Sequence, residues 1–251
     1  MNKSGLNSLI SVRNLEFSYP KKEILKSVSF EIKSGGSLSI LGENGCGKST
    51  LLKCMLGLLK FKGEILLNGI NLHKYSRSNL AKNIAYIPQF PNVTFEYEAI
   101  DVVLMSRLAH KGFFENYSKK DYEICYMGLE RLGITHLANR VFKTLSGGER
   151  QLVYLARALS CGAKAIFMDE PVSGLDFGNQ IKLLNLIKEL SLEGYTIIIT
   201  THHPRHAKFL NGAVLMLKDG VKFGHGSVDL LDTKNISELY AVDYEKYKEI
   251  L

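Results

Sequence analysis

A glycine-rich stretch that ends in a lysine and two hydroxyl residues carries the clearest chemistry in this sequence. Residues 42–50 read GENGCGKST and fit the phosphate-loop pattern G-x-x-x-x-G-K-[ST]. Glycines let the backbone turn tightly, so several N–H groups can face phosphate oxygens, and the N-terminus of a following helix also favours an anion. We therefore expect a nucleoside triphosphate here, with Lys48 at its β- and γ-phosphates and the Ser49 hydroxyl as a Mg²⁺ ligand. The predicted nucleotide-binding residues are Gly42, Glu43, Asn44, Gly45, Cys46, Gly47, Lys48, Ser49 and Thr50.

Two adjacent acids follow an apolar run at residues 165–168 and form the second chemical feature. Asp169 would hold Mg²⁺, directly or through water, and so position the β- and γ-phosphates. Glu170 is placed to accept a proton from the attacking water or to polarise it. The alternative is two solvated acids that cap a strand. The apolar strand and the phosphate loop upstream favour the catalytic interpretation.

A second glycine turn, with Ser146, Gly147 and Gly148 before Glu149, opens a predicted helix. Its N–H groups, its hydroxyl and the helix dipole could bind another anion. Taken alone, an ordinary glycine-rich helix cap would be the better interpretation. However, one nucleotide does not need two phosphate cradles from one chain. We therefore predict a two-fold homodimer in which this turn closes over the γ-phosphate held by the other copy.

These motifs need strands and helices to position them, and hydrophobic periodicity predicts an α/β protein. Apolar residues on one helical face are Ile100, Val103, Leu104 and Leu108, and on another Tyr122, Cys125, Leu129 and Leu132. An Asp219-Gly220 turn predicts a hairpin over residues 213–226. The other predicted strands are 9–19, 24–32, 37–41, 63–69, 83–89, 165–170 and 195–201, and the other predicted helices are 51–59, 146–160 and 180–192, with short helices after 228.

We assign these elements to a single domain, residues 1–251, built as a P-loop NTPase core with a mixed or parallel sheet. The core would comprise residues 9–90 and 160–226, and it would begin with an antiparallel β layer. About 91–159 would form a helical subdomain that carries the second glycine turn, and 227–251 a short C-terminal tail.

Composition says less about the class of protein than the motifs do. The formal net charge is +7, yet the lysines are spread along the chain without an aromatic-interleaved basic block, which favours a solvated basic surface over nucleic-acid binding. A modest attraction to anionic lipid head groups stays open. The N-terminus lacks the apolar core of a secretory signal, no apolar run approaches the roughly 20 residues of a membrane span, and the four cysteines have no disulfide or metal spacing. We therefore expect a cytoplasmic protein with reduced thiols.

The order of the motifs resembles that of ABC-transporter ATPase subunits, over about residues 9–239. By this resemblance Tyr19 stacks on adenine, although from the strand pattern alone a half-buried strand tyrosine is at least as plausible. The resemblance also implies that Gln89 contacts Mg²⁺ and water, that Glu170 is the catalytic base, and that His202 is the switch histidine at the γ-phosphate. Asp176 would belong to a loop at the dimer contact, the D-loop. The matching segments are 42–50, Gln89, 145–149, 166–170, 173–176 and His202.

Three residues depart from the family pattern. Glu149 stands where glutamine is commoner, which should not impair closure over ATP. Gly174 stands where alanine is usual and could loosen the D-loop. His203 takes the place of a commoner aspartate.

Residues 101–110, 129–134 and 238–240 resemble importers of iron chelates, haem, cobalamin and molybdate. This resemblance implies an ATP- and Mg²⁺-dependent ATPase homodimer, peripheral on the cytoplasmic face of the inner membrane. Its partners would be two transmembrane permease subunits and, indirectly, a substrate-binding protein, with no nucleic acid. Residues near Gln89 and Arg107 would pass motion to the permease.

Three alternatives compete with an importer. A non-transport ABC ATPase acting on nucleic acid or ribosomes usually has two ATPase halves or a long coiled-coil insert, neither of which is present. A P-loop kinase acting on a small molecule would leave residues 145–149 unexplained. The third alternative is an exporter, but export ATPases are commonly fused to their membrane domain, and this sequence has no apolar run long enough to be one.

Overall fold

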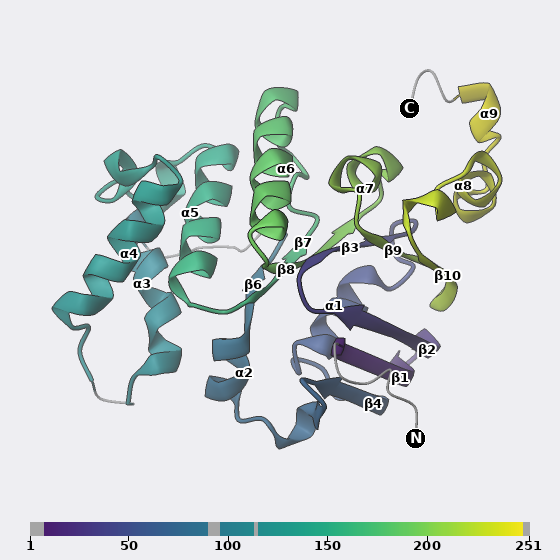
Figure 1. Ribbon diagram of the computed structural model, residues 1–251, viewed down its shortest axis with the longest axis horizontal. Coiled ribbons are helices and arrows are strands. Elements are labelled where there is room, and N and C mark those ends of the chain that lie inside the picture. Colours follow the sequence, from purple (N-terminus) through teal and green to yellow (C-terminus); the bar gives the residue numbers. More distant parts are fainter. Residues whose placement is uncertain (1–7, 90–95, 113–114, 248–251) are drawn as a thin grey trace. The chain divides into compact units, whose positions relative to one another are not determined.

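The computed structural model describes residues 8–89, 96–112 and 115–247 (Figure 1). The chain forms two compact units, one of Met1–Tyr75 with Ile187–Leu251 and the other of Ser76–Leu186. The limit expected near residue 91 for the helical subdomain lies outside the described residues, as does the N-terminal segment 1–7. The compact units divide the chain at other points, so the expected subdomain limits stay a prediction.

The first unit begins with the antiparallel layer expected from the sequence. Strands β1 (Ser8–Tyr19), β2 (Lys22–Lys33), β4 (Lys62–Leu67) and β5 (Ile70–Asn71) lie in the order β2-β1-β4-β5. Apolar residues of β1 and β2, among them Leu15 and Leu25, are fully buried. The alternation of apolar and polar residues thus gives the layer one face that packs on the core.

The strand before the phosphate loop lies in the middle of a second set of strands in this unit. β3 (Gly36–Leu41) pairs in parallel with β8 (Thr196–Thr201) and β9 (Ala213–Lys218), and β10 (Val221–Gly226) pairs antiparallel with β9. Every residue of β8 is buried, as its continuous apolar and β-branched run predicts. Asp219 and Gly220 both have positive φ, 49° and 79°, which confirms the predicted Asp-Gly hairpin turn.

Helices α1 (Lys48–Met55), α7 (Pro204–Leu210), α8 (Thr233–Tyr240) and α9 (Tyr244–Tyr247) also belong to this unit (Figure 1). α1 begins three residues earlier than predicted and is shorter. α7 was not predicted. Its first residue is a proline, and the first position of a helix is favourable for proline. The C-terminal segment packs into the core, since Leu231, Ile236 and Leu239 cluster with Leu41, Ala207, Val214 and Met216.

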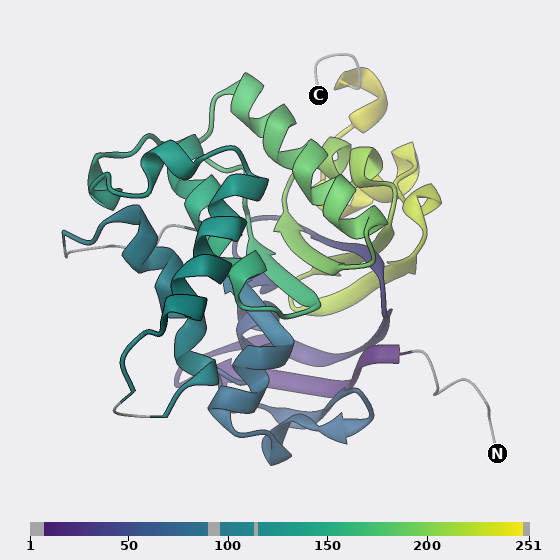
Figure 2. The same cartoon turned by 60° about the vertical axis from the view of Figure 1, so that its left-hand side comes forward.

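The second unit is mainly helical. It contains α2 (Arg77–Asn83), α3 (Ala99–Leu104), α4 (Lys119–Arg131), α5 (Gly147–Ser160), and the parallel pair β6 (Ile84–Ile87) and β7 (Ala165–Asp169). Helices α3, α4 and α5 pack against one another (Figures 1 and 2). α6 (Phe177–Leu192) begins in this unit and ends in the first.

Two apolar residues assigned to buried helical faces are exposed. Leu108 lies in a 3₁₀ turn, Met105–His110, which ends the α-helical period of α3, and its side chain is 59% exposed. Tyr122 in the first turn of α4 is 42% exposed. Cys125 and Leu129 are fully buried as predicted. Within the ranges described above, no helix is both long and apolar enough to cross a bilayer.

Candidate functional site

The phosphate loop connects β3 to α1, so a strand precedes it and a helix follows it, as the motif requires. Gly42 directly follows Leu41, and only glycine fits there because a Cβ would lie 2.2 Å from the carbonyl oxygen of Leu217 on β9. The amide of Cys46 donates to the carbonyl of Glu43 at 3.3 Å, which closes a tight turn. Glycine thus allows the loop to lie directly against the neighbouring strand.

Lys48, the first residue of α1, is buried and reaches back over the loop. Its Nζ donates to the carbonyls of Gly42 at 2.8 Å and Glu43 at 3.0 Å. Ser49 and Thr50 follow at half-buried positions in the first turn of the helix. The ammonium group therefore stands beside the loop backbone, where it would meet a bound phosphate.

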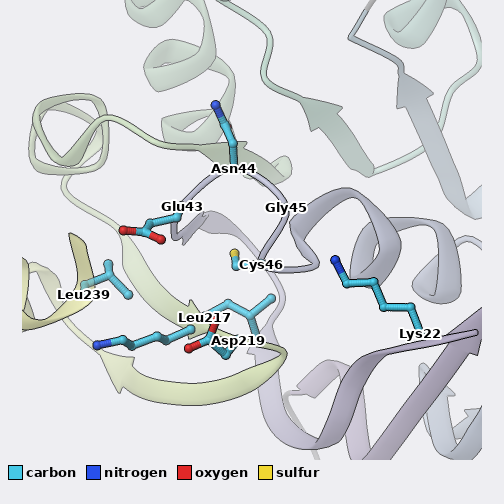
Figure 3. Close-up of a pocket in the computed structure, with 9 residues that line it drawn as sticks. Lys22, Glu43, Asn44, Gly45, Cys46, Leu217, Asp219 and Leu239 are labelled. Carbon is cyan, nitrogen blue, oxygen red and sulfur yellow. The ribbon is translucent and has the colours of Figure 1, made fainter. Parts of the chain in front are cut away.

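A pocket of about 230 Å³ borders the loop (Figure 3). It is lined by loop residues 43–46, by Leu217, Lys218 and Asp219 of the hairpin, and by Lys22 and Leu239. Tyr19 pairs with Lys22 across the β1–β2 hairpin, so this tyrosine sits on the hairpin that reaches the pocket. The Tyr19 ring is 46% exposed and packs edge-on against Phe17, with ring centroids 4.9 Å apart.

His202 follows β8 at the same edge of the sheet as the phosphate loop. Leu41 pairs with Thr201, so Gly42 and His202 leave neighbouring parallel strands side by side. The His203 ring lies 4.0 Å from the His202 ring between centroids, and the His206 ring lies 4.8 Å from that of His203. Burial, together with the charges of His203 and His202, lowers the pKa of His206 to about 4.

In the second unit the structure brings together Gln89 and Glu170. Ile87 of β6 pairs with Met168 of β7, so the residues that follow the two strands meet at one edge. The Gln89 side-chain amide donates to a carboxylate oxygen of Glu170 at 3.1 Å. Glu170 has a φ of 45°, a left-handed conformation that is uncommon for a residue with a side chain and that often marks functional sites.

Asp169 ends β7 and is only 4% exposed. Burial raises the pKa of the neighbouring Tyr86 to about 12, and the negative charge of Asp169 adds to this effect. Carboxylate oxygens are ligands that hard cations such as Mg²⁺ prefer. The arrangement is suitable for an aspartate that holds a metal–phosphate complex.

The second glycine turn caps α5. The Ser146 hydroxyl accepts from the amide of Glu149 at 3.3 Å, and the Glu149 carboxylate accepts from the amide of Ser146 at 2.7 Å, forming a capping box. The backbone N–H of Ser146, and then its hydroxyl, lower the pKa of Glu149. Ser146 itself is exposed. Glu149 therefore completes the capping box that supports this turn.

The D-loop segment lies against this turn. A Cβ on Gly148 would lie 3.1 Å from the Asn179 side chain, and one on Gly147 would lie 3.3 Å from Leu175. Asp176 caps the start of α6, since its carboxylate accepts from the amide of Asn179 at 3.0 Å and from its side chain at 2.6 Å. Sequence reasoning missed Asn179, although an Asp with a polar residue three positions later at a helix start signals such a cap.

Arg107, expected to transmit motion to the permease, lies in a nearly buried ionic network. Its guanidinium donates to the Asp121 carboxylate at 3.1 Å and to the carbonyl of Ser160 at 2.9 Å. Lys111 approaches the same carboxylate at 3.0 Å. These contacts give Arg107 a structural role, because they join parts of the second unit.

Comparison with known proteins shows which family this chain is similar to. A family model described as "ABC transporter" matches residues 25–173, which include the phosphate loop, the capped glycine turn and the acidic end of β7. This match covers more than half of the chain.

Relatives and a solved structure extend over nearly the full chain. A molybdate import ATP-binding protein of Haemophilus influenzae is 36% identical, covering 94% of this chain and 89% of the relative. An iron(3+)-hydroxamate import ATP-binding protein of Bacillus subtilis is 32% identical, covering 96% and 90%. A metal-chelate type ABC transporter in an inward-facing conformation matches with a TM-score of 0.82 and 35% identity, covering 93% of this chain and 88% of that chain.

The relatives match over nearly the full length of this chain. This chain therefore belongs to the ABC transporter family as an ATP-binding protein, an ATPase that couples ATP hydrolysis to transport.

Proposed function

We propose that this protein is the ATP-hydrolysing subunit of an ABC importer for a metal chelate or a related substrate. The observation that carries the catalytic part is the Gln89–Glu170 hydrogen bond beside the buried Asp169. It unites the residues expected to handle the attacking water and the metal–phosphate complex. The import part rests on relatives named for molybdate and iron(3+)-hydroxamate import.

The transported substrate belongs to the siderophore-iron, haem, cobalamin or molybdate class in this proposal. The chelate assignment draws support from the matching metal-chelate type transporter. Choice among these substrates is expected to lie with the substrate-binding protein and the permease subunits.

Hydrolysis needs little covalent chemistry from the protein, because positioning and electrostatic stabilisation supply most of the catalysis. The loop N–H groups and the Lys48 ammonium neutralise the β- and γ-phosphates, and Tyr19 offers a ring face to adenine. Glu170 orients the attacking water and accepts its proton. His202 donates a hydrogen bond to the γ-phosphate and so senses whether it is present.

The residues present suit Mg²⁺. The Ser49 hydroxyl, the Asp169 carboxylate and the Gln89 amide oxygen are the hard oxygen ligands that this ion prefers, and Mg²⁺ is usually held by one or two carboxylates together with substrate phosphates. Mg²⁺, when bound with ATP, supplies charge neutralisation at the β- and γ-phosphates.

We further propose a homodimer in which the Ser146 turn of one subunit contacts the ATP held by the phosphate loop of the other, with Asp176 near the contact. The exposure of Ser146 and its place at the N-terminus of α5, the end of a helix that favours an anion, support this arrangement. Two permease subunits would receive the closing motion, at the cytoplasmic face of the membrane, and a substrate-binding protein would act with them.

The test is ATPase rate against protein concentration for the wild type, Glu170→Gln and Ser146→Arg. Removing the base should lower turnover by about 10²- to 10⁴-fold. Arginine at Ser146 should also abolish turnover, because its side chain would occupy the dimer contact. The wild-type rate per subunit should rise with concentration, and a permease subunit in lipid should stimulate it.

Glu123→Gln, on the exposed face of α4, is the matched control and should keep wild-type activity. Full turnover in Glu170→Gln would show that the base is assigned wrongly. A rate that is independent of concentration and unaffected by Ser146→Arg would indicate a monomeric enzyme. Stimulation by nucleic acid, lost at high salt, would favour the non-transport alternative.

A further inference from the structure

The β9–β10 hairpin contacts the phosphate loop through the backbone of its turn. The N–H of Gly220 donates to the carbonyl of Cys46 at 3.1 Å, and the carbonyl of Gly220 accepts from the N–H of Lys26 on β2 at 2.9 Å. Figure 3 shows Leu217 and Asp219 on this hairpin beside Cys46 on the loop. One residue, Gly220, therefore links the loop to a strand of the antiparallel layer.

The position of Gly220 admits no side chain. Its φ is +79°, and a Cβ there would lie 2.1 Å from the carbonyl oxygen of Ile24, well inside van der Waals contact. The pocket of about 230 Å³ lies against loop residues 43–46, so this stretch has open space on one side. The hydrogen bond from Gly220 thus fixes the loop at the end of a partly unsupported segment.

Because the peptide bond is planar, the hydrogen bond to the Cys46 carbonyl also determines where the N–H of Gly47 points. In a trans peptide the carbonyl and the following N–H point in opposite directions. Because the Cys46 carbonyl points to Gly220, the N–H of Gly47 points away from the hairpin. Gly47 is the N-cap of α1, and the N–H groups at a helix start lack intrahelical partners and favour an anion.

We propose that Gly220 is a positioning residue for ATP binding, because it sets the orientation of the Cys46–Gly47 peptide and so aims the Gly47 N–H at a bound phosphate. This inference rests on the proposed nucleotide site at residues 42–50. Neither the phosphate-loop pattern nor the family resemblance pointed to a role for this hairpin turn.

The chain offers a closely matched control. Asn68 and Gly69 form the turn between β4 and β5 with φ values of 51° and 76°, against 49° and 79° for Asp219 and Gly220. A Cβ on Gly69 would have nothing within 4 Å. Gly69→Ala therefore imposes the same backbone strain in the same type of turn, without displacing the phosphate loop.

The experiment measures Kd for ATP and ADP, and KM and kcat for ATP, in the wild type, Gly220→Ala and Gly69→Ala. We expect Gly220→Ala to raise the Kd of both nucleotides and the KM by about tenfold or more, the scale of one lost charge-assisted hydrogen bond. Gly69→Ala should stay within about twofold, while both variants unfold at lower temperature because of the backbone strain.

Equal nucleotide affinities in the two folded variants would overturn the inference, since displacing the Gly220 turn would then leave the phosphate-binding N–H groups unaffected. If Gly220→Ala does not fold, amide hydrogen exchange of the wild type decides instead. The Gly220 N–H should exchange far more slowly than an unstructured peptide, and exchange at the unstructured rate would contradict the proposal. Failure of the wild type itself to bind ATP would instead refute the nucleotide site.

Discussion

At the scale of single residues, the rings of His202, His203 and His206 lie next to one another, tilted, in the segment that follows β8. His206 is half-buried, and the Thr201 hydroxyl lies 3.3 Å from its Nδ1. Burial and the neighbouring His203 and His202 disfavour the imidazolium form and so lower its pKa. His206, whose ring lies 4.8 Å from that of His203, is therefore neutral at physiological pH.

This shift predicts a stability loss in acid. The pKa of His206 falls from 6.5 to about 4 on folding, so between these values the unfolded chain binds a proton that the folded chain does not. The free energy of unfolding should therefore decrease as pH falls from about 6.5 to about 4. Urea denaturation midpoints across this range would measure the loss.

His206→Gln should flatten that pH dependence. A residual slope is expected because the pKa of His225 is also lowered, mainly by its burial. Identical slopes in the wild type and in His206→Gln would show that His206 does not cause the acid sensitivity.

At the scale of elements, an ionic network fixes the start of α4. Asp121 accepts from the amide of Ser118 at 2.8 Å and from its hydroxyl at 2.6 Å, and it also pairs with Arg107 and Lys111. The Ser118 hydrogen bonds are the main cause of the lowered pKa of Asp121. Since Arg107 also binds the carbonyl of Ser160 at the end of α5, the network joins the 3₁₀ turn, α4 and α5.

Asp121→Ala should lower the free energy of unfolding by about 3–5 kcal/mol, because two nearly buried cations would lose their partner. Glu64→Ala is the comparison, since it breaks an exposed pair with Arg13 and should cost no more than about 1 kcal/mol. Denaturant titration of both variants measures the difference. Equal, small losses would mean that solvent reaches the network more easily than the structure shows.

Helix α8 is part of the core that supports the phosphate loop. Leu239 is fully buried and shares a cluster with Leu41, the residue directly before Gly42. Leu239→Ala should therefore cost about 2–5 kcal/mol, whereas Leu58→Ala, at a position 61% exposed, should cost less than about 0.5 kcal/mol. Thermal or urea unfolding would test this, and a near-neutral Leu239→Ala would mean that the C-terminal segment is dispensable.

The strands and α5 could be predicted from the sequence because their signals are local. β8 is a continuous β-branched run, the Asp219-Gly220 turn has its own signature, and Ser146 begins α5 as its N-cap. The exposure of Leu108 could not be predicted, because it depends on a change from α-helical to 3₁₀ geometry that leaves the apolar spacing unchanged. The contact of Gly220 with Cys46 was equally hidden, since it joins backbone groups far apart in the sequence.

At the scale of the whole molecule, the two-copy arrangement is a prediction about association. Each chain carries one phosphate loop and one Ser146 turn, so a dimer would use both pairs in two equivalent sites. Sedimentation of Glu170→Gln with Mg²⁺ and ATP should give twice the chain mass, because the nucleotide persists. Mg²⁺ and ADP should give the single-chain mass.

Adding Ser146→Arg to Glu170→Gln should prevent the ATP-dependent dimer. A species of twice the chain mass that forms without nucleotide, or that survives this substitution, would show that the copies associate through another surface.

The chemical residues were predictable because each is tied to a short motif. Phosphate binding can be inferred from residues 42–50. The roles of Asp169 and Glu170 can be inferred from their place at the end of an apolar strand. What could not be predicted is which groups contact them, such as the Gln89 amide on Glu170, because 81 positions separate the two residues in the chain. Strand register determines this contact, and register emerges only when the sheet forms.

The capping box at Ser146 has a consequence for genetics. The Ser146 hydroxyl caps α5 and, in the proposed dimer, also donates a hydrogen bond to ATP. A loss-of-function allele at this codon could therefore act through misfolding or through failed catalysis. The two duties can be separated by the chemistry of the replacement. Aspartate is an equally good N-cap but offers no proton and repels phosphate, so Ser146→Asp should yield a normally abundant protein with no transport. An allele of that kind would act as a dominant inhibitor in mixed dimers, whereas a folding defect would be recessive.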